Sequence, residues 1–527
     1  MAPYLGLRGS ALSRAFIGLV VLPAFFCYGY NLSVAGGLLT LDSFVQAFPQ
    51  LDTINTVGEE LRRNSTIQGN YISPRSIRPQ DNIATGTVVA LFTVGGMLGS
   101  LSCVYLGDKL GRRRVIFVAS ATTAIGAALM ALSFSLAQLI TARIVLGIGT
   151  GGYVATVPVW QSEISKPSKR GAHVVTNGIF LGAGASVALW IALGFYFVKG
   201  TTLSWRFPLG FQIILLVITM VFVCVLPESP RWLVKQGRHD EARAILAALG
   251  DVDPDHDAIT QEIRDIRLSL SVCGTMSWKT MFSMGNQRML HRTALAAAGQ
   301  MFQQLCGINL ITMYATTILE QHLGMGPVKS RALAASMCMT QPLGGFFAFF
   351  TIDRLGRRRL MLWSAAGMAA CMAVLSGTTS ARDNAVALLV AIVFLFAFQF
   401  IFTVGYSGLT FLYAAEIAPL PLRAAISAVS TAVVWVFNFL LAEVTPVGFN
   451  TIGSRFYVVF AVLNAAIVPT VYLFFPETSG RSLEEIDDIF TRSKSIWDPP
   501  RVAKSVQSSP EGGASLDKDE SIGQAAA

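Results

Sequence analysis

The sequence predicts an all-α membrane protein whose twelve transmembrane helices form two six-helix halves. Of its 527 residues, 53% are hydrophobic and only 13% are charged, about half the charge of a typical soluble domain. Apolar runs of about 20 residues, long enough to cross a bilayer, recur along the chain. The charged segment Gly107-Asp-Lys-Leu-Gly-Arg-Arg-Arg114 also recurs, almost unchanged, as Ile352-Asp-Arg-Leu-Gly-Arg-Arg-Arg359. Each copy lies between two apolar runs, which indicates a duplicated chain.

The apolar runs give six predicted spans on each side of a polar central segment. The first begins at about Ala15 and is too long for the core of a signal peptide, so we expect it to stay in the protein. The 47 glycines suit membrane helices, because small residues let helix backbones approach closely. The spans are predicted near residues 15–38, 84–106, 115–132, 138–158, 172–196, 207–226, 290–318, 331–351, 359–377, 385–413, 423–446 and 455–475.

Polar segments complete the predicted organisation. A long loop, 41–82, follows the first span, and the central segment is charged and helix-prone. The end of the chain is rich in serine, glycine and alanine and is predicted to be disordered. The predicted divisions are a cytoplasmic amino terminus (1–14), a first six-helix half (15–226), cytoplasmic linker helices (227–289), a second six-helix half (290–475) and a cytoplasmic tail (476–527).

Three acidic residues in the first half have counterparts in the second. The separation within each pair is nearly the same, so the two halves should run in the same orientation. The pairs are Asp108 with Asp353, Glu163 with Glu416, and Glu228 with Glu477.

Lysine and arginine set the predicted orientation. With twelve spans, Arg112–Arg114, Lys166–Arg170, Arg357–Arg359 and the central segment share one side, which the positive-inside rule makes cytoplasmic. The net charge of +9 therefore belongs to loops beside spans and does not indicate a nucleic-acid-binding domain. The loop 41–82 then faces the outside or a lumen, and its Asn64-Ser-Thr66 pattern predicts N-glycosylation of Asn64.

The sequence lacks the features of an ATP-driven pump, an enzyme or a channel. It has no GxxxxGK[ST] phosphate loop and no repeated pore-lining filter, and its five histidines are dispersed. Its seven cysteines have no metal-binding spacing. We therefore expect no catalytic residue, no metal and no cofactor.

Seven motifs stand in order along the chain: Gly107–Arg114, Arg143–Gly147, Pro158–Glu163, Pro227–Val234, Gln303–Asn309, Asp353–Arg359 and Pro476–Glu485. Together they resemble the sugar porters of the major facilitator superfamily, and the fungal members in particular. The resemblance covers about residues 15 to 490. It implies the fold of that superfamily and transport of a sugar by alternating access.

The charged motifs predict an ion-pair network at the cytoplasmic helix ends. Acids at span ends need partners, which the arginines can supply. The resemblance implies that these pairs hold the halves together when the protein opens outward and break when it opens inward. The alternative is that the arginines only fix topology. The network comprises Asp108, Arg112, Arg113, Glu163, Glu228, Asp353, Arg357, Arg358, Glu416 and Glu477.

Polar residues within apolar spans are the candidates for substrate binding. Gln303, Gln304 and Asn309 lie in span 7, on a helix that Gly307 can loosen. Their carboxamides donate and accept hydrogen bonds, which suits sugar hydroxyls. Hydrogen bonding between helices is the alternative. The resemblance adds Tyr314, Gln341, Phe411, Trp435 and Asn438. Tryptophan or phenylalanine would stack on the apolar face of the sugar, and plain packing in the core is the alternative for each aromatic residue.

Two places depart from the family pattern. Where the family commonly has a sugar-binding glutamine in span 5, this chain has Gly178 beside Asn177. In span 10, the stretch Tyr406–Phe411 lacks the family's two prolines and has Phe411 in place of a tryptophan. We expect a straighter span 10 and one hydroxyl contact fewer. These departures favour a disaccharide, another polyol or a secondary metabolite over plain glucose.

Proton coupling depends on one position. Proton-coupled sugar porters carry an aspartate in span 1 that faces an arginine in span 4, whereas this chain has Asn31, with Arg143 retained. Because asparagine does not titrate, we predict facilitated uniport. Glu443 in span 11 is the one candidate acid that could substitute, and the alternative places it near the outer surface beside Pro446.

Two other functions stay open at this point: an exporter of a fungal secondary metabolite and a sugar sensor that does not transport. The tail after Glu485 is short for a signalling tail, which favours transport. We expect a multi-pass protein of the plasma membrane, functional as a monomer. Its partners would be a sugar-like small molecule and the lipid bilayer, with no nucleic acid.

Overall fold

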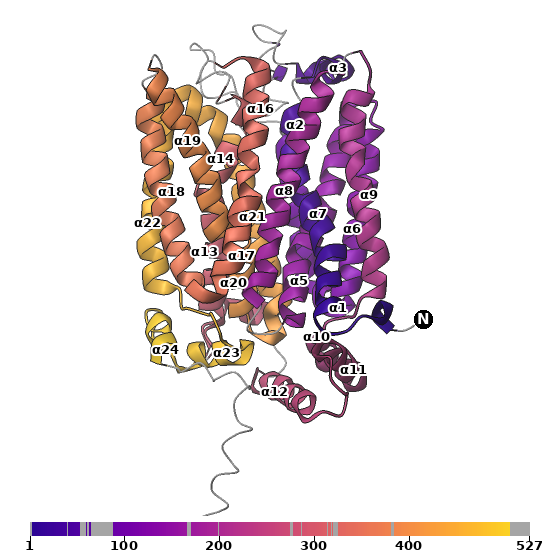
Figure 1. Ribbon diagram of the computed structural model, residues 1–527. Coiled ribbons are helices and arrows are strands. Elements are labelled where there is room, and N and C mark those ends of the chain that lie inside the picture. The colour runs from indigo at the N-terminus through magenta and orange to yellow at the C-terminus, as the bar shows by residue number, and fades with distance from the viewer. Residues whose placement is uncertain are drawn as a thin grey trace, which may run out of the picture.

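Long helices that run side by side make up most of the computed structural model (Figure 1). The structure describes residues 3–38, 41–52, 60, 63–64, 88–165, 170–198, 200–273, 278–285, 287–313, 315–317, 319, 325–380 and 384–505. Eleven helical segments in these ranges are long and apolar enough to cross a membrane. The seventh predicted span adds a further crossing as an interrupted helix. The predicted all-α membrane fold is therefore confirmed.

The first half begins with a span built from three consecutive helical pieces. The pieces are α1 (Gly9–Phe16), a π-helical turn (Ile17–Val21) and α2 (Leu22–Leu38). The other five spans of this half are single helices: α5 (Val88–Leu110), α6 (Arg112–Ala131), α7 (Leu136–Ile164), α8 (Arg170–Tyr196) and α9 (Leu203–Val225). Two short helices, α3 (Asp42–Ala47) and η3 (Pro49–Leu51), follow the first span.

In the second half, three of the six spans are divided into shorter helices. Span 7 is divided into α13 (Met289–Leu305), α14 (Ile308–Met313) and α15 (Ala315–Thr317); span 8 into α16 (Pro327–Cys338) and α17 (Thr340–Leu355); and span 10 into α19 (Ala385–Phe402), the π-helical turn η8 (Thr403–Ser407) and α20 (Leu409–Ile417). Three spans are undivided: α18 (Arg357–Ser380), α21 (Arg423–Ile452) and α22 (Phe456–Phe474).

Span 10 contains a π-helical turn although the family's two prolines are missing, and the expectation of a straighter span stays a prediction. Two glycines pack closely within and just after this turn. A Cβ atom on Gly405 would lie 2.2 Å from Oγ of Ser364, and one on Gly408 would lie 2.8 Å from the carbonyl oxygen of Val175. A π turn leaves the regular hydrogen-bond pattern of the helix, and such turns recur at functional sites. Tertiary contacts therefore interrupt this span without proline.

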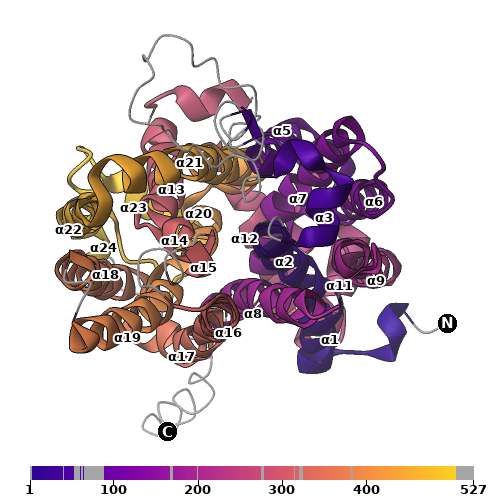
Figure 2. The ribbon, with the colours of Figure 1, turned by 90° about the horizontal axis from the view of Figure 1, so that it is seen from above.

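The two halves lie side by side when the molecule is seen along its helices (Figure 2). Helix α5 packs on α21, and α8 packs on α16 and α17, so two seams join the halves. Close approach of small residues also holds each half together. For example, a Cβ atom on Gly99 of α5 would lie only 1.9 Å from the carbonyl oxygen of Ile148 on α7.

One end of the bundle carries both copies of the repeated loop, with Asp108 and Asp353, and we call it the charged face. The linker helices α10 (Pro230–Lys235), α11 (His239–Gly250) and α12 (Asp257–Cys273) lie there (Figure 1). So do two helices of the tail, α23 (Leu483–Arg492) and α24 (Pro499–Ser505). An apolar cluster connects the linker to the second half; it includes Trp232, Leu233, Ile245, Ile266 and Leu420. The serine- and glycine-rich end of the tail lies outside the described residues.

Candidate functional site

A buried ion pair fixes the repeated loop of the first half. Arg112, which begins α6, is 2% exposed. Its Nε and Nη2 atoms donate to the two carboxylate oxygens of Glu163, the penultimate residue of α7, over 3.0 and 2.9 Å. The backbone N–H groups of Arg112 and Arg113 donate to the carboxylate of Glu228 over 3.2 and 3.1 Å. Burial raises the pKa of Glu228 above its ordinary value, although these hydrogen bonds and the nearby arginine charges oppose the rise.

The second half repeats this arrangement residue for residue. Arg357, 1% exposed, donates from Nε and Nη2 to Glu416 over 3.3 and 3.0 Å. The backbone N–H groups of Arg357 and Arg358 donate to Glu477 over 2.8 and 3.0 Å. Asp353 adds a contact of 2.9 Å to the Arg357 guanidinium. The duplicated sequence therefore forms a duplicated network.

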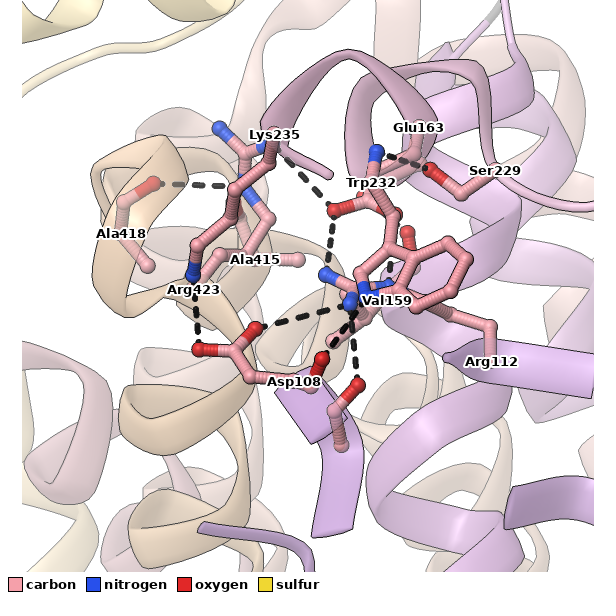
Figure 3. A network of polar contacts seen from close by, with 12 residues as sticks. Asp108, Arg112, Val159, Glu163, Ser229, Trp232, Lys235, Ala415, Ala418 and Arg423 are labelled. Carbon is pink, nitrogen blue, oxygen red and sulfur yellow. Dashed lines mark hydrogen bonds and ion pairs between the residues drawn. The ribbon is translucent and has the colours of Figure 1, made fainter. Parts of the chain in front are cut away.

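These pairs lie within the halves, so the expectation that they join the two halves needs correction. The repeated loop connects consecutive spans of one half, and the nearest acids belong to the same half. Other atoms make the contacts between halves (Figure 3): Arg423 Nη1 lies 3.7 Å from Oε1 of Glu163. In addition, the backbone N–H of Ala172 donates to Asp353 over 2.9 Å.

The linker contributes a third contact between the halves. Lys235 of α10 donates from Nζ to Asp108 over 2.8 Å and to the carbonyl oxygen of Pro421 over 2.9 Å. Trp232 supports this position, because its indole N–H donates to the carbonyl oxygen of Asp108 over 2.9 Å. The two halves are thus held together at the charged face. Sequence reasoning missed Lys235 and Arg423 because nothing in the repeated motif singles them out.

Span 7 breaks at the glycine that the sequence pointed to. Gly307 has a φ of +96°, and a Cβ atom there would lie 2.7 Å from Cε of Met372. Such a positive φ strongly favours glycine. The break exposes the carbonyl group of Cys306, which accepts a hydrogen bond of 2.9 Å from Nδ2 of Asn464. The interruption therefore has its own polar support inside the second half.

The three carboxamides of span 7 form one hydrogen-bonded row across this break. Asn309 donates to Oε1 of Gln304 over 2.5 Å, and Gln304 donates to Oε1 of Gln303 over 3.2 Å. Gln303 in turn donates to the carbonyl oxygens of Tyr406 and Ser407 in η8, over 3.1 and 2.9 Å. The row links the interruptions of spans 7 and 10, so the alternative of hydrogen bonding between helices is observed, and sugar binding by these residues stays a prediction.

A second set of polar contacts lies beside this row. Gln341 donates to Oε1 of Gln399, and Gln399 donates to Oγ1 of Thr312 over 3.2 Å. Gln300, one turn before Gln304, accepts from Thr410 over 3.2 Å. Sequence reasoning missed Gln300 and Gln399. Each is a glutamine within an apolar run, which is the feature that could have indicated them.

Several buried polar groups have no hydrogen-bond partner in the described part of the chain. They include both amide atoms of Asn438 and of Asn177, the indole nitrogen of Trp435 and Oγ of Ser407. Buried polar groups are nearly always hydrogen-bonded in folded proteins, and each exception needs an explanation. Asn177 belongs to α8 of the first half, whereas Trp435 and Asn438 belong to α21 of the second.

Aromatic side chains from both halves meet beside these groups. Trp435 of α21 lies with its ring centroid 5.4 Å from Tyr28 and 5.4 Å from Phe92, both of the first half. Phe411 of α20 lies 5.9 Å from Phe25 of α2. Trp435 and Phe411 were singled out in the sequence, and the structure brings both to the boundary between the halves. Tyr314 lies outside the described residues.

Gly178 also lies at this boundary. A Cβ atom there would approach the backbone nitrogen of Gly408 at 2.9 Å and Oγ of Ser407 at 3.0 Å. The glutamine that the family commonly has at this place would therefore need the halves to move apart. Glycine at this position allows α8 and the π-turn region of span 10 to pack directly.

The predicted coupling pair is buried but not joined by a hydrogen bond within the described residues. Asn31 is 1% exposed, and neither of its amide atoms has a partner there. Arg143 is 5% exposed and forms no ion pair in the described ranges. Glu443 of α21 is partly exposed.

The predicted glycosylation site is sequestered in this conformation. Nδ2 of Asn64 donates to the carbonyl oxygens of Asp52 and Pro49, over 2.9 and 3.2 Å, and the side chain is fully buried. A glycan would replace one of the two hydrogens on this nitrogen, so at least one of the two bonds would be lost and the buried side chain would have to become accessible. Glycosylation of Asn64 stays a prediction that this packing does not support.

The profile of the family described as sugar (and other) transporter matches residues 17–490, which is most of the chain. The chain belongs to the sugar transporter family. It is a multi-pass membrane transporter and not an enzyme. The transporter is 33% identical to the MFS-type transporter oryC of Aspergillus oryzae, over 94% of this chain and 88% of that protein. It is 32% identical to the sugar transporter STL1 of Saccharomyces cerevisiae, over 93% and 83% of the two chains.

Solved structures share the transporter's fold at lower identity. The proton:xylose symporter XylE bound to 6-bromo-6-deoxy-D-glucose gives a TM-score of 0.76 at 20% identity, covering 92% of this chain and 100% of that one. The inward open conformation of XylE from E. coli gives a TM-score of 0.63 at 21% identity, covering 90% and 99%. These likenesses show that the transporter has the fold of the major facilitator superfamily.

We expect Gln304→Ala to raise the KM for substrate about tenfold, because a lost ligand hydrogen bond removes roughly 1–1.5 kcal/mol. Gln304 is the centre of the carboxamide row, with partners on both sides. Concentration-dependent uptake, normalised to the surface level of the transporter, measures the change. Gln261→Ala on the exposed face of α12 is the matched control. An unchanged KM for Gln304→Ala would remove span 7 from the substrate site.

Proposed function

We propose that the transporter carries a sugar or related polyol across its membrane by alternating access, as a uniporter without proton coupling. The observation that carries this proposal is the carboxamide row of span 7, flanked by buried amides without partners at Asn438 and Asn177. Carboxamides donate and accept hydrogen bonds and so match hydroxyl groups. Because they are uncharged, their burial in the membrane without a ligand costs less free energy than burial of a charge. Trp435 and Phe411 add apolar faces for stacking.

Alternating access requires two states that differ in which side is open. Contacts between the halves at the charged face support a state that is closed on that side. We place the charged face in the cytoplasm, because the basic loops lie there. Substrate then enters from the opposite side, and separation of Glu163 from Arg423 accompanies opening toward the cytoplasm.

Uniport rests on the chemistry of Asn31. Its amide has no titratable proton, and Arg143 forms no ion pair with an acid within the described residues.

The plasma membrane is the location that we propose, and a monomer is the oligomeric state that we propose. The packing of Gly178 against Gly408 supports a substrate other than a plain hexose, because the usual glutamine contact is missing. Export of a secondary metabolite is the second candidate function, and it rests on the same missing glutamine contact at Gly178.

Uptake of radiolabelled hexoses, disaccharides and polyols into transport-deficient cells tests the substrate class. We expect saturable uptake of at least one sugar or polyol, with no alkalinisation of a weakly buffered medium. Uptake of none of them would favour the metabolite exporter. Saturable binding of a sugar without any flux would favour a sensor.

Asn31→Asp is expected to make uptake depend on pH, because it places a carboxyl group that can take up and release a proton in the span that faces Arg143. Uptake measured across imposed proton gradients, together with the pH of the medium, reports this change. Asn384→Asp is the matched control, since Asn384 is exposed and caps α19, a role that aspartate also fills. Alkalinisation by the unmodified transporter would contradict uniport.

A further inference from the structure

A cavity of about 270 Å³ lies between the linker helices α11 and α12, apart from the boundary between the halves. These two helices lie beyond the ends of the spans at the charged face (Figure 1). From α11 the cavity is lined by His239, Asp240 and Arg243. From α12 it is lined by residues at helical spacing: Thr260, Ile263, Arg264 and Arg267. Both helices therefore present one continuous face to it.

The lining is strongly cationic. Three arginines face one carboxylate, that of Asp240, so the cavity carries a net positive charge. Arg267 forms no hydrogen bond or ion pair in the described part of the chain, and Arg264 has only a long contact of 3.5 Å to Gln261. The guanidinium groups of Arg264 and Arg267, on neighbouring turns of α12, thus have N–H groups available to a ligand.

The third arginine is held in place at the edge of the cavity. Nη1 of Arg243 donates to the carbonyl oxygen of Pro254 over 3.1 Å and to Thr260 over 3.2 Å. Its ionic partner, Asp255, is 3.7 Å away and 93% exposed, so water weakens that pair. Arg243 therefore keeps most of its charge available to the cavity.

Two further groups favour an anion at this place. His239 begins α11, a helix of 12 residues whose N-cap residue, Arg238, makes no side-chain capping bond. The positive end of a helix attracts anions. In addition, Nδ1 of His239 is buried and has no hydrogen-bond partner among the described residues. An anion in the cavity would meet an imidazole, a helix end and three guanidinium groups.

We propose that this cavity binds a phosphate-bearing ligand. Planar guanidinium groups match phosphate oxygens in pairs, and several such contacts offset the charge of a dianion. The volume suits a small phosphorylated molecule or a lipid headgroup and excludes a macromolecule. The cavity lies at the charged face, apart from the carboxamide row of span 7.

Binding at this site has a mechanical consequence. Ile266 of α12 and Ile245 of α11 pack in the same apolar cluster as Leu420, which precedes α21 of the second half. Arg423, three residues after Leu420, makes the contact to Glu163 between the halves. A ligand that ties α11 to α12 therefore stiffens the support of the closed charged face.

Calorimetric titration of the purified full-length transporter with sodium pyrophosphate tests the site. We expect saturable binding that weakens as sodium chloride is raised. The double variant Arg264→Gln/Arg267→Gln should bind at least tenfold more weakly, because each lost charged hydrogen bond costs about that factor or more. Arg492→Gln, which removes an exposed arginine from α23, should bind as the unmodified chain does.

A second arm distinguishes the source of the phosphate. The transporter is placed in phosphatidylcholine nanodiscs with or without phosphatidylinositol phosphate, and its melting temperature is compared with that of the double variant. A melting temperature that rises only with the phosphoinositide, and does not rise in the double variant, supports a lipid headgroup as the ligand. A melting temperature that rises only when pyrophosphate is added supports a soluble ligand. Absence of saturable binding in both arms, or equal binding by the double variant, overturns the proposal.

Discussion

Glu163→Gln is expected to lower the free energy of unfolding of the transporter by about 3 kcal/mol, because it deprives the buried charge of Arg112 of its closest partner and leaves only Asp108, 3.6 Å away. Arg112 is 2% exposed and depends on both oxygens of Glu163, while Arg423, 1% exposed, lies 3.7 Å from one of them. Glutamine keeps the size of the side chain and removes only the charge. The melting temperature of the detergent-purified protein, with uptake by cells, measures the effect.

The duplicated architecture provides an internal comparison for this prediction. Glu416→Gln should cost less, because Arg357, although as deeply buried as Arg112, keeps its contact of 2.9 Å with Asp353. Asp488→Asn is the control, since Asp488 and its partner Arg492 are both about two-thirds exposed and their pair contributes less than about 1 kcal/mol. A Glu163→Gln protein as stable as the Asp488→Asn protein would show that the buried pair is not needed.

Arg423→Gln is expected to shift the transporter toward the state that is open at the charged face. The substitution removes the ionic contact between halves and leaves the Arg112–Glu163 pair in place. A contact of this kind biases a two-state equilibrium by about 1–3 kcal/mol, a factor of roughly 5–150. Slower uptake should follow, because return to the closed state becomes less favourable.

A single cysteine can report this shift. Gly107 and Ala424 face each other across the halves: a Cβ atom on Gly107 would lie 3.2 Å from that of Ala424. Ala424→Cys in a cysteine-free background should therefore react slowly with a thiol reagent when the charged face is closed and faster in the Arg423→Gln protein. Arg113→Gln is the matched control, because Arg113 donates to carbonyl groups of its own half. If Ala424→Cys reacts equally fast with and without Arg423→Gln, Arg423 has no role in closing the charged face.

Features that depend on short stretches of sequence could be predicted. Apolar length and the repeated loop indicated the spans and the two halves, because hydropathy and motif identity are local properties. Gly307 indicated the break in span 7, since the turn there has a φ of +96°. Polar residues in apolar runs indicated Gln303, Gln304 and Asn309, which the structure joins in one row.

Features that depend on packing could not be predicted. Nothing in the sequence indicated the π-helical turn of span 10, which lies where Gly405 and Gly408 contact other helices. The burial of Asn64 depends on backbone carbonyls of Pro49 and Asp52, which no sequence pattern identifies. Gln399 is one glutamine among apolar residues until its hydrogen bond with Gln341 places it at the site.

Sequence alone was enough to establish that the chain crosses the membrane repeatedly, that it is duplicated, and that the repeated arginines would pair with acids at span ends. Hydropathy, the identity of a repeated motif and the need of a span-end acid for a partner are properties of short stretches of chain. Only the tertiary structure decided that Arg423, Lys235 and the backbone of Ala172 join one half to the other. Contacts between halves depend on how two separately folded bundles face each other, and that arrangement arises from the summed packing of many helices.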